Sequence, residues 1–496
     1  MSEFKILLKQ SSHYFTGRIF LMGAGLISFP ILTRIFSVAD YGILSLISTT
    51  LFIIIAIVKL GFPNAIVRFY AEFKAEKRLA KFYPTIFSGS LLAAAVGAAL
   101  FFASIQLISD KFINKDIFRL LSLVSILIFT KSTVENLMGF LRAEQRTKLY
   151  NLIAIIRGYG SLVFSIFFVF FFVKGLYGFY VGQILFSFIS LSILVYMFRT
   201  RIKIGVASFS LPLLKQSIKF GFPLVWAELG HLILNYADRY LILLYLSSTY
   251  LGLYTAGYNL IVHVMQTIIY PINYAMTPIY MNILVNKGKQ QTKQFFSKLF
   301  NYFLLITLPS VFGLIAVGRD LIIFLASAKY AEAYLVLPYI VIGQAIYACT
   351  ILLNSGLFIR KKTHVVTILM IITCILNIGL NIVLIPLFGI IGAAQATLVS
   401  YIFYTILITY LAFKEFSFPI HYERVFLYLV ASLIMFIIIN KINFGSHLFN
   451  LVTRVLIGAT IYSILVVILD REIRAQFVAI GSKVIHRSHE RLSMRN

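Results

Sequence analysis

The sequence is poor in charged side chains, and acidic ones are the scarcest. Asp, Glu, Lys and Arg make up 12% of the 496 residues and hydrophobic residues 60%, whereas soluble globular proteins carry about 25% charged and 45–50% apolar residues. This composition excludes a water-soluble enzyme, a disordered protein and a nucleic-acid-binding domain. The chain has 17 Asp and Glu against 44 Lys and Arg, and its net charge is +27. The basic residues cluster between apolar runs, which indicates a membrane rather than a nucleic acid as the partner.

Motifs for catalysis or metal binding are missing too. The two cysteines, Cys349 and Cys374, lie in apolar segments and suit neither a disulfide framework nor a metal site. The sequence contains no GxxxxGK[ST] loop, no HExxH and no CxxC, so P-loop ATP hydrolysis is excluded. We therefore expect no cofactor, no metal, no catalytic residues and no enzyme activity.

Apolar runs of the length that crosses a bilayer, about 20 residues, fill most of the chain. They predict an all-α, polytopic membrane protein of about fourteen transmembrane helices, and no β-barrel pattern competes. The predicted spans are 14–35, 42–62, 82–108, 117–141, 151–173, 176–198, 219–246, 253–283, 297–325, 334–357, 365–386, 390–413, 425–440 and 450–470.

Basic residues alternate between successive connections. They gather in the N-terminal segment, in every second connection and in the tail, whereas the connections at 247–252 and 387–389 contain no Lys or Arg. Because cytoplasmic loops carry the excess of Lys and Arg, we expect a plasma-membrane protein with both termini in the cytoplasm.

The chain also contains signs of an internal duplication. The five residues 7–11 recur letter for letter as 213–217, Tyr41-Gly42 matches Leu251-Gly252, and Gly175 with Gly178 matches Gly389 with Gly392. An even number of spans per repeat makes the repeats parallel, an architecture found in transporters that rock one half against the other. The predicted domains are two six-helix lobes at 1–205 and 206–415, two further helices at 416–475 and a basic cytoplasmic tail at 476–496.

Ionisable residues occur inside the predicted spans, where each costs several kcal/mol unless it faces a cavity or a partner. In the first half they are Arg18, Lys59, Lys131, Glu135 and Arg157. Two simpler explanations stay open. Lys131 and Glu135 are four residues apart and can neutralise each other, and the three others are close enough to the cytoplasmic ends to extend toward the headgroups.

Polar residues form longer stripes in the seventh and eighth spans. Glu228, His231, Asn235 and Asp238 share one helix face, with Arg239 beside them, because their spacing follows the helical repeat. Asn259 and Gln266 belong to a second stripe. Neither stripe can face acyl chains, so each faces either a hydrated cavity, which we favour, or another helix.

Several segments carry a family resemblance: Leu32-Thr-Arg34 with Asp40-Tyr-Gly42, Phe220-Gly-Phe-Pro-Leu-Val225, Asn235-Tyr-Ala-Asp-Arg239-Tyr240, the segment 250–258 and the segment 377–394. They resemble the polysaccharide-repeat-unit flippases (the Wzx type) of the multidrug/oligosaccharidyl-lipid/polysaccharide exporter superfamily. The resemblance covers nearly the whole chain.

The resemblance implies a monomeric transporter that flips an undecaprenyl-pyrophosphate-linked oligosaccharide to the outer leaflet, by alternating access and driven by an ion gradient. A polysaccharide polymerase is an expected partner. A pyrophosphate needs fixed cations, and sugars need amide and hydroxyl partners. We therefore expect the substrate to be bound by Arg18, Lys59, Lys131, Arg157, Arg239, Asn235, Asn259 and Gln266. The candidates for ion coupling are Glu228, His231, Asp238 and Glu135.

Three alternatives stay open at this point. A lipid II flippase of the same superfamily would differ only in its cargo. A multidrug exporter would need an anionic cavity for cationic drugs, against which the surplus of basic residues argues. A membrane-embedded polysaccharide polymerase or ligase would need a long outer loop with catalytic residues, and no such loop is predicted.

Overall fold

Helices account for nearly all of the regular structure in the described part of the chain. The structure, a computed structural model, describes residues 20, 23–107, 115–202 and 208–475, and it has no strand within them. The all-α fold is therefore confirmed. The helices are Gly23–Ile35, α2 (Val38–Val58), α3 (Phe62–Ala75), α4 (Leu79–Leu107), α5 (Lys115–Ala143), α6 (Thr147–Phe171), α7 (Gly175–Phe198), α8 (Leu211–Tyr236), α9 (Asp238–Tyr245), α10 (Ser248–Ala326), η2 (Ala328–Val336), α11 (Leu337–Leu353), α12 (Ser355–Ile359), α13 (Thr363–Glu415), α14 (Tyr422–Asn440) and α15 (His447–Leu469).

Ten of the described helices are long and apolar enough to cross a membrane, so the protein is a multi-pass membrane protein. Fourteen spans are predicted, and the difference has identifiable causes. The spans 365–386 and 390–413 lie in one helix, α13, and the first span is described only as Gly23–Ile35. The span 219–246 is helical but is not among the ten, and the end of the span 253–283 lies in the candidate that begins at Ile279.

Two long helices are each interrupted by one glycine. Gly288 in α10 has φ 81° and ψ −179°, and Gly389 in α13 has φ 61° and ψ −140°. Both values lie where only glycine is comfortable, so the breaks fall at the connections that the sequence predicts near these positions. Gly175, which the duplication matches with Gly389, also has a positive φ, of 79°.

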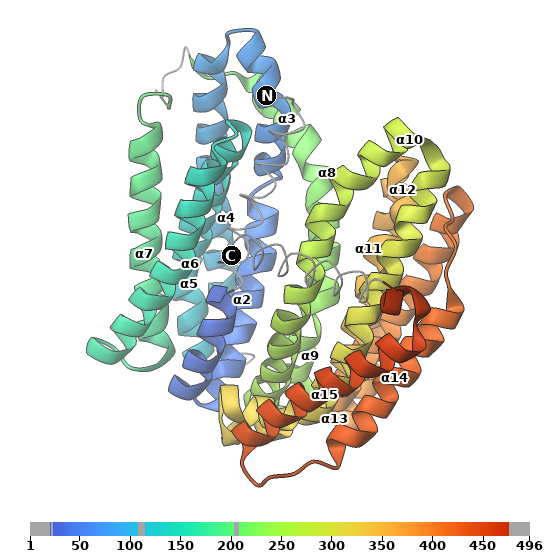
Figure 1. Cartoon of the computed structure of the whole chain (residues 1–496). Coiled ribbons are helices and arrows are strands. Elements are labelled where there is room, and N and C mark those ends of the chain that lie inside the picture. Colours follow the sequence, from blue (N-terminus) through green and yellow to red (C-terminus); the bar gives the residue numbers. More distant parts are fainter. Residues whose placement is uncertain (1–19, 21–22, 108–114, 203–207, 476–496) are drawn as a thin grey trace, which may run out of the picture. The chain divides into compact units, whose positions relative to one another are not determined.

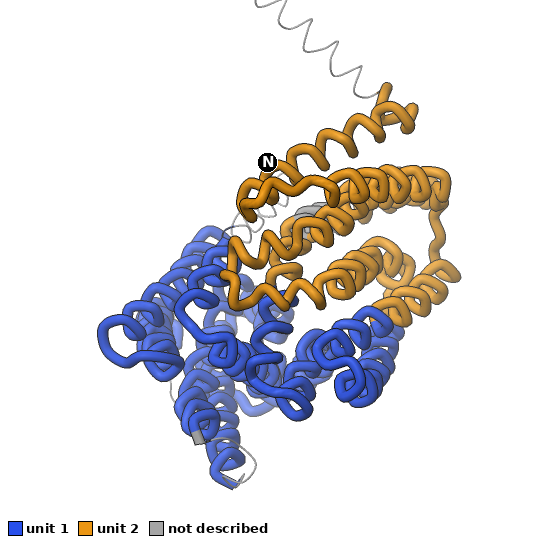
Figure 2. Tube along the Cα trace, turned by 90° about the horizontal axis from the view of Figure 1, so that it is seen from below, with its two compact units in different colours: residues 1–259, 364–400 blue, residues 260–363, 401–496 orange. Residues whose placement is uncertain are grey.

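The chain divides into two compact units (Figure 2). The first comprises residues 1–259 and 364–400, and the second comprises residues 260–363 and 401–496. This division cuts through α10 and α13 and does not test the boundaries of the predicted duplication, which stay a prediction. The duplicated segment at 7–11 lies outside the described residues.

In the first unit, α4, α5, α6 and α7 lie side by side (Figure 1). Their ends near residues 82, 140 and 198 meet in a core of aromatic rings. The Phe140 ring lies 4.8 Å from Tyr83, 6.0 Å from Phe82 and 5.7 Å from Phe198 between ring centroids. Buried rings of this size contribute most of the apolar contact area, so this end of the bundle is firmly packed.

The second unit has a separate aromatic core. Phe296 of α10 packs on Phe416 and Phe418 beyond the end of α13, and Tyr428 of α14 belongs to the same buried cluster. An apolar cavity of about 640 Å³ lies between α10, α14 and α15 of this unit, with Arg454 on its wall. Arg454 donates to Asp320 Oδ2 at 3.1 Å and to the carbonyl of Ile442, so its charge is paired.

Candidate functional site

A cavity of about 560 Å³ in the first unit brings together five of the predicted site residues. Lys59 comes from the end of α2, Lys131 and Glu135 from α5, Arg157 from α6 and Glu228 from α8. The other lining residues are Phe52, Ile55, Met138, Tyr150, Ala154, Gly158, Ser161, Phe186, Ser187, Ser190 and Leu232. Hydroxyl groups and aromatic rings therefore share the wall with the charges.

Two ion pairs cross this cavity. Lys59 Nζ lies 2.9 Å from Glu228 Oε1, and Arg157 Nη2 lies 3.2 Å from Glu135 Oε1. Lys131 donates instead to Gln183 Oε1 at 2.8 Å, so the ion pair of Glu135 is with Arg157 and not with Lys131. Glu135 pairs with Arg157 of α6, whose guanidinium forms a charge-assisted hydrogen bond with the carboxylate.

The charges of the cavity do not cancel. Its wall carries three cations and two carboxylates, and a net positive charge remains. The carboxylates are the more exposed partners, with 43% of the Glu228 side chain and 45% of Glu135 accessible against 15% for Lys59 and 22% for Arg157. The carboxylate is therefore the more accessible partner of each pair.

A smaller cavity of about 220 Å³ shares Lys59, Glu135 and Glu228 with the first one. It adds Arg142 and Asn64 to the polar wall. Arg142 Nε is buried and has no hydrogen-bond partner among the described residues. The sequence does not single out Arg142 as a site residue, because Arg142 lies in one of the basic connections that are predicted to be cytoplasmic.

The backbone beside Lys59 is bent and tightly packed. Lys59 caps the end of α2, and the next two residues, Leu60 and Gly61, both have positive φ values, 48° and 70°. Gly61 lies against Gly221 of α8, where a Cβ atom on Gly221 would come within 2.7 Å of the Gly61 carbonyl oxygen. Glycine is required on both sides, because the two backbones approach too closely for any side chain.

Four of the predicted polar residues, Asn235, Asp238, Arg239 and Asn259, form a second cluster, which is apart from this cavity. Arg239 is 3% exposed. It donates to Thr49 Oγ1 at 3.0 Å and to Asn259 Oδ1 at 3.2 Å, and its guanidinium lies 4.5 Å from the ring of Tyr236. The two terminal nitrogens of Arg239 are therefore engaged within the protein, while its Nε is buried without a hydrogen-bond partner among the described residues. Arg239 and Asn259 form helix contacts here.

The neighbours of Arg239 are paired in the same way. The Asp238 carboxylate is buried and accepts a hydrogen bond from the Tyr254 hydroxyl. Asn235 accepts a hydrogen bond from Tyr258 at 3.1 Å and donates to the backbone carbonyl of His231 at 2.6 Å. None of these residues lines the charged cavity. Of the two explanations for the stripes, hydrogen bonding between helices holds for this part of them.

Three predicted site residues are not brought into either cluster. Arg18 lies outside the described residues. The His231 side chain is exposed on α8, one turn from Glu228, and is not on the cavity wall. Gln266 is half-buried on the part of α10 that belongs to the second unit. In the described part of the chain no three His, Cys, Asp or Glu side chains are grouped as metal ligands would be.

The sequence matches a family model over residues 31–335, and that family is described as polysaccharide biosynthesis protein. The chain belongs to this family. No curated protein matches the sequence.

Several solved structures similar to this polysaccharide biosynthesis protein are described as a flippase or as transporters. The lipid II flippase MurJ, in an inward closed conformation, aligns with a TM-score of 0.76 at 18% identity, over 93% of this chain and 99% of MurJ. A mutant of the MATE transporter VcmN of Vibrio cholerae aligns with a TM-score of 0.57 at 14% identity, over 82% of this chain and 96% of VcmN.

A third match is a multidrug resistance MATE family transporter of the MOP superfamily in an inward-facing conformation. It aligns with a TM-score of 0.60 at 14% identity, over 82% of this chain and 94% of the transporter. The low identities mean that these matches show the fold. The shared fold and the family match over residues 31–335 agree with the resemblance that the sequence motifs indicate.

Proposed function

We propose that the protein is a flippase that moves an undecaprenyl-pyrophosphate-linked oligosaccharide from the cytoplasmic to the outer leaflet of the plasma membrane. The observation that carries this proposal is the charged cavity, in which Lys59, Lys131 and Arg157 outnumber Glu135 and Glu228. A pyrophosphate is recognised by fixed cations away from bulk water. The serine hydroxyls and aromatic rings of the same wall suit the sugars.

In this proposal the two ion pairs connect substrate binding to an ion gradient. While Glu228 holds Lys59, the ammonium is occupied, and the same is true of Arg157 beside Glu135. Protonating a carboxylate frees the cation for the pyrophosphate, and losing the proton later displaces the headgroup. Glu135 and Glu228 are thus the coupling residues, and Asp238 and Arg239 have a structural role.

Alternating access is the mode of transport that the fold supports. Structures with the same fold are described as inward closed for MurJ and as inward-facing and outward-facing for a MATE family transporter. A protein that flips its cargo in this way needs no catalytic residue. We place both termini in the cytoplasm, where the basic connections of the sequence put them.

A lipid II flippase is the second candidate, and the alignment with MurJ favours it. Both cargoes are lipid-linked glycans, so the cavity chemistry serves either of them. A multidrug exporter for cationic drugs fits less well, because the cavity has a surplus of positive charge.

The test is a leaflet-exposure assay with the full chain in vesicles that contain either an undecaprenyl-pyrophosphate glycan or lipid II. We expect wild type to flip the glycan and Arg157→Gln to flip it at least tenfold more slowly. The matched control is Arg199→Gln, which removes the same charge from an exposed residue stacked 4.0 Å over Tyr196 and outside the cavity. Flipping of lipid II alone would favour the second candidate, and equal rates in Arg157→Gln and wild type would refute the cavity assignment.

A further inference from the structure

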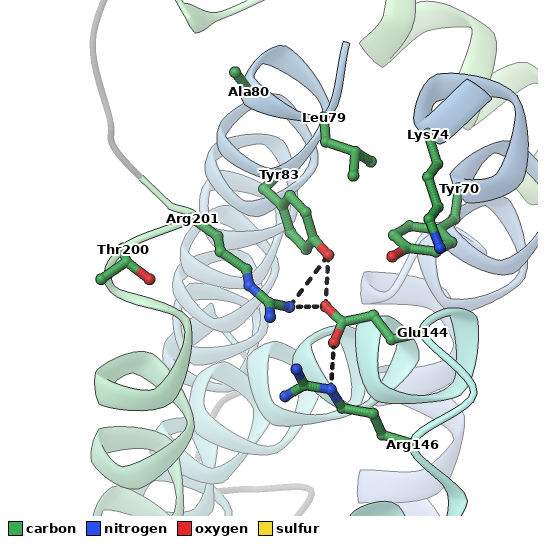
Figure 3. Close-up of a pocket in the computed structure, with 9 residues that line it drawn as sticks. All are labelled: Tyr70, Lys74, Leu79, Ala80, Tyr83, Glu144, Arg146, Thr200 and Arg201. Atoms are coloured by element: carbon green, nitrogen blue, oxygen red, sulfur yellow. Dashed lines mark hydrogen bonds and ion pairs between the residues drawn. The ribbon is translucent and has the colours of Figure 1, made fainter. Parts of the chain in front are cut away.

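A second polar cavity, of about 670 Å³, lies in the first unit where several helices begin and end (Figure 3). It is formed by the end of α3, the start of α4, the connection between α5 and α6 and the residues that follow α7. Its lining residues are Tyr70, Lys74, Leu79, Ala80, Tyr83, Glu144, Arg146, Thr200 and Arg201. It shares no lining residue with the charged cavity described above.

The Glu144 carboxylate forms ion pairs with two arginines in this cavity. Glu144 Oε1 accepts hydrogen bonds from Tyr83 and from Arg201, and its Oε2 lies 3.0 Å from Arg146 Nε. Only 5% of the Glu144 side chain is exposed, against 48% of Arg146 and 35% of Arg201. Both oxygens of the carboxylate therefore have hydrogen-bond partners and are shielded from solvent. Each arginine is more exposed and has further N–H donors.

A third cation faces this group across the cavity (Figure 3). Lys74 is exposed, its ammonium lies 6.0 Å from the ring centroid of Tyr70, and it has no carboxylate partner in the described part of the chain. With three cations and one carboxylate on the wall, the cavity has a surplus of two positive charges. An arrangement of donors around an open space with this charge suits a phosphate group.

The position of the cavity indicates the source of that phosphate. All three connections that form it belong to the basic set that the sequence predicts to be cytoplasmic. Tyr196, which is 63% exposed, lies near the end of α7, where interfacial aromatic residues sit at the level of the headgroups. Basic pockets at such helix ends on the cytoplasmic side bind anionic lipid headgroups.

We propose that this cavity binds the phosphate of an anionic phospholipid of the cytoplasmic leaflet. Lys74 and Arg146 contact the phosphate oxygens, and Arg201 is held in place by Glu144 and Tyr83. The site is separate from the proposed transport cavity, and it does not depend on the identity of the cargo. A free phosphate ion offers the same chemistry, and the experiment distinguishes the two sources.

The experiment measures thermal unfolding of the purified full chain in detergent while phosphatidylglycerol, phosphatidylcholine or inorganic phosphate is added. We expect phosphatidylglycerol, and not phosphatidylcholine, to raise the Tm in a saturable way. In Lys74→Gln and in Arg146→Gln the half-saturating phosphatidylglycerol concentration should rise about fivefold each, the effect of one basic residue near an anionic headgroup.

The matched control is Lys81→Gln, which removes the same charge from an exposed residue in the first turn of α4 that does not line the cavity. It should leave the half-saturating concentration unchanged. Equal responses of Lys74→Gln and Lys81→Gln would show general attraction to a basic surface and overturn the proposal. Stabilisation by inorganic phosphate at the same concentrations, with the same dependence on Lys74, would overturn the assignment to a lipid.

Discussion

Removing the Glu228 carboxylate should strengthen pyrophosphate binding, and removing its partner Lys59 should weaken it. The two side chains form an ion pair of 2.9 Å on the cavity wall, so a ligand must compete with Glu228 for the ammonium. In Glu228→Gln the competitor is neutral and the cavity carries one more unit of positive charge. In Lys59→Gln the ligand loses a cation.

The magnitude follows from the exposure of the pair. A hydrogen bond to a charged group contributes about 1.5–3 kcal/mol, but 43% of the Glu228 side chain is exposed, so solvent screening reduces the value to the lower end. About 1.4 kcal/mol corresponds to a tenfold change in affinity. We expect binding about tenfold tighter in Glu228→Gln, about tenfold weaker in Lys59→Gln and close to wild type in the double variant.

The assay is a titration of the detergent-solubilised chain with farnesyl pyrophosphate, a short soluble analogue of the lipid carrier. Binding is followed by the heat released, because Trp226, the single tryptophan of the chain, lies on a different face of α8 from Glu228 and does not line the cavity. Glu72→Gln is the matched control, because Glu72 pairs with Arg68 on exposed α3 at 3.8 Å. A purely structural ion pair would make both single variants weaker binders, and that result would refute the reasoning.

Three further predictions concern stability and are measured by unfolding of the chain in detergent. Gly221→Ala should destabilise the first unit by about 1–3 kcal/mol, since the added Cβ would lie 2.7 Å from the Gly61 carbonyl oxygen. The control Gly379→Ala has open space around it and should stabilise α13 by about 0.5–1 kcal/mol. Equal effects of the two substitutions on stability would contradict the close contact. Arg239→Ala should cost about 2–4 kcal/mol because it leaves buried polar partners unsatisfied, whereas Arg199→Ala should change stability by less than about 0.5 kcal/mol. Burial alone would raise the pKa of Asp470, but hydrogen bonds from Tyr428 and from two backbone N–H groups hold that pKa below its ordinary value. Its stabilising contribution is therefore complete above the unfolded-state pKa of about 3.9 and is lost as the pH falls through the lower folded-state value, a loss that Asp470→Asn should not show.

Much of the fold could be predicted because the bilayer imposes it. A run of about 20 apolar residues has to be a helix, and the described helices follow the predicted spans. The breaks were predictable as well, since Gly389 lies between two apolar runs that are each long enough to span. The boundary between the compact units was not, because it depends on packing between segments that are distant in sequence.

The charged cavity could be predicted in part for a similar reason. Lys59, Lys131 and Arg157 are conspicuous because a charge inside a span needs a partner or a cavity. Their partners could not be predicted, since Gln183 and Glu228 are brought to them by tertiary packing.

The polar stripes illustrate where sequence reasoning ends. Helical periodicity places Asn235 and Asp238 on one face, but it cannot say whether that face meets water or another helix. In the structure Tyr258 donates to Asn235 and Tyr254 donates to one oxygen of Asp238, while Asp238 Oδ1 has no partner among the described residues. Arg142 was missed for the opposite reason, because the count of basic residues in the connections conceals a side chain that lines a cavity.

The bend that follows α2 has a mechanical consequence. Lys59 is joined directly to two consecutive residues with left-handed backbone angles, and the second of them is wedged against α8. Any change in the backbone bend at Leu60 and Gly61 therefore also displaces the Lys59 ammonium group. A substitution at Gly61 that leaves every charge in place would therefore still change the electric field inside the cavity, and its phenotype could be mistaken for that of a charge mutant.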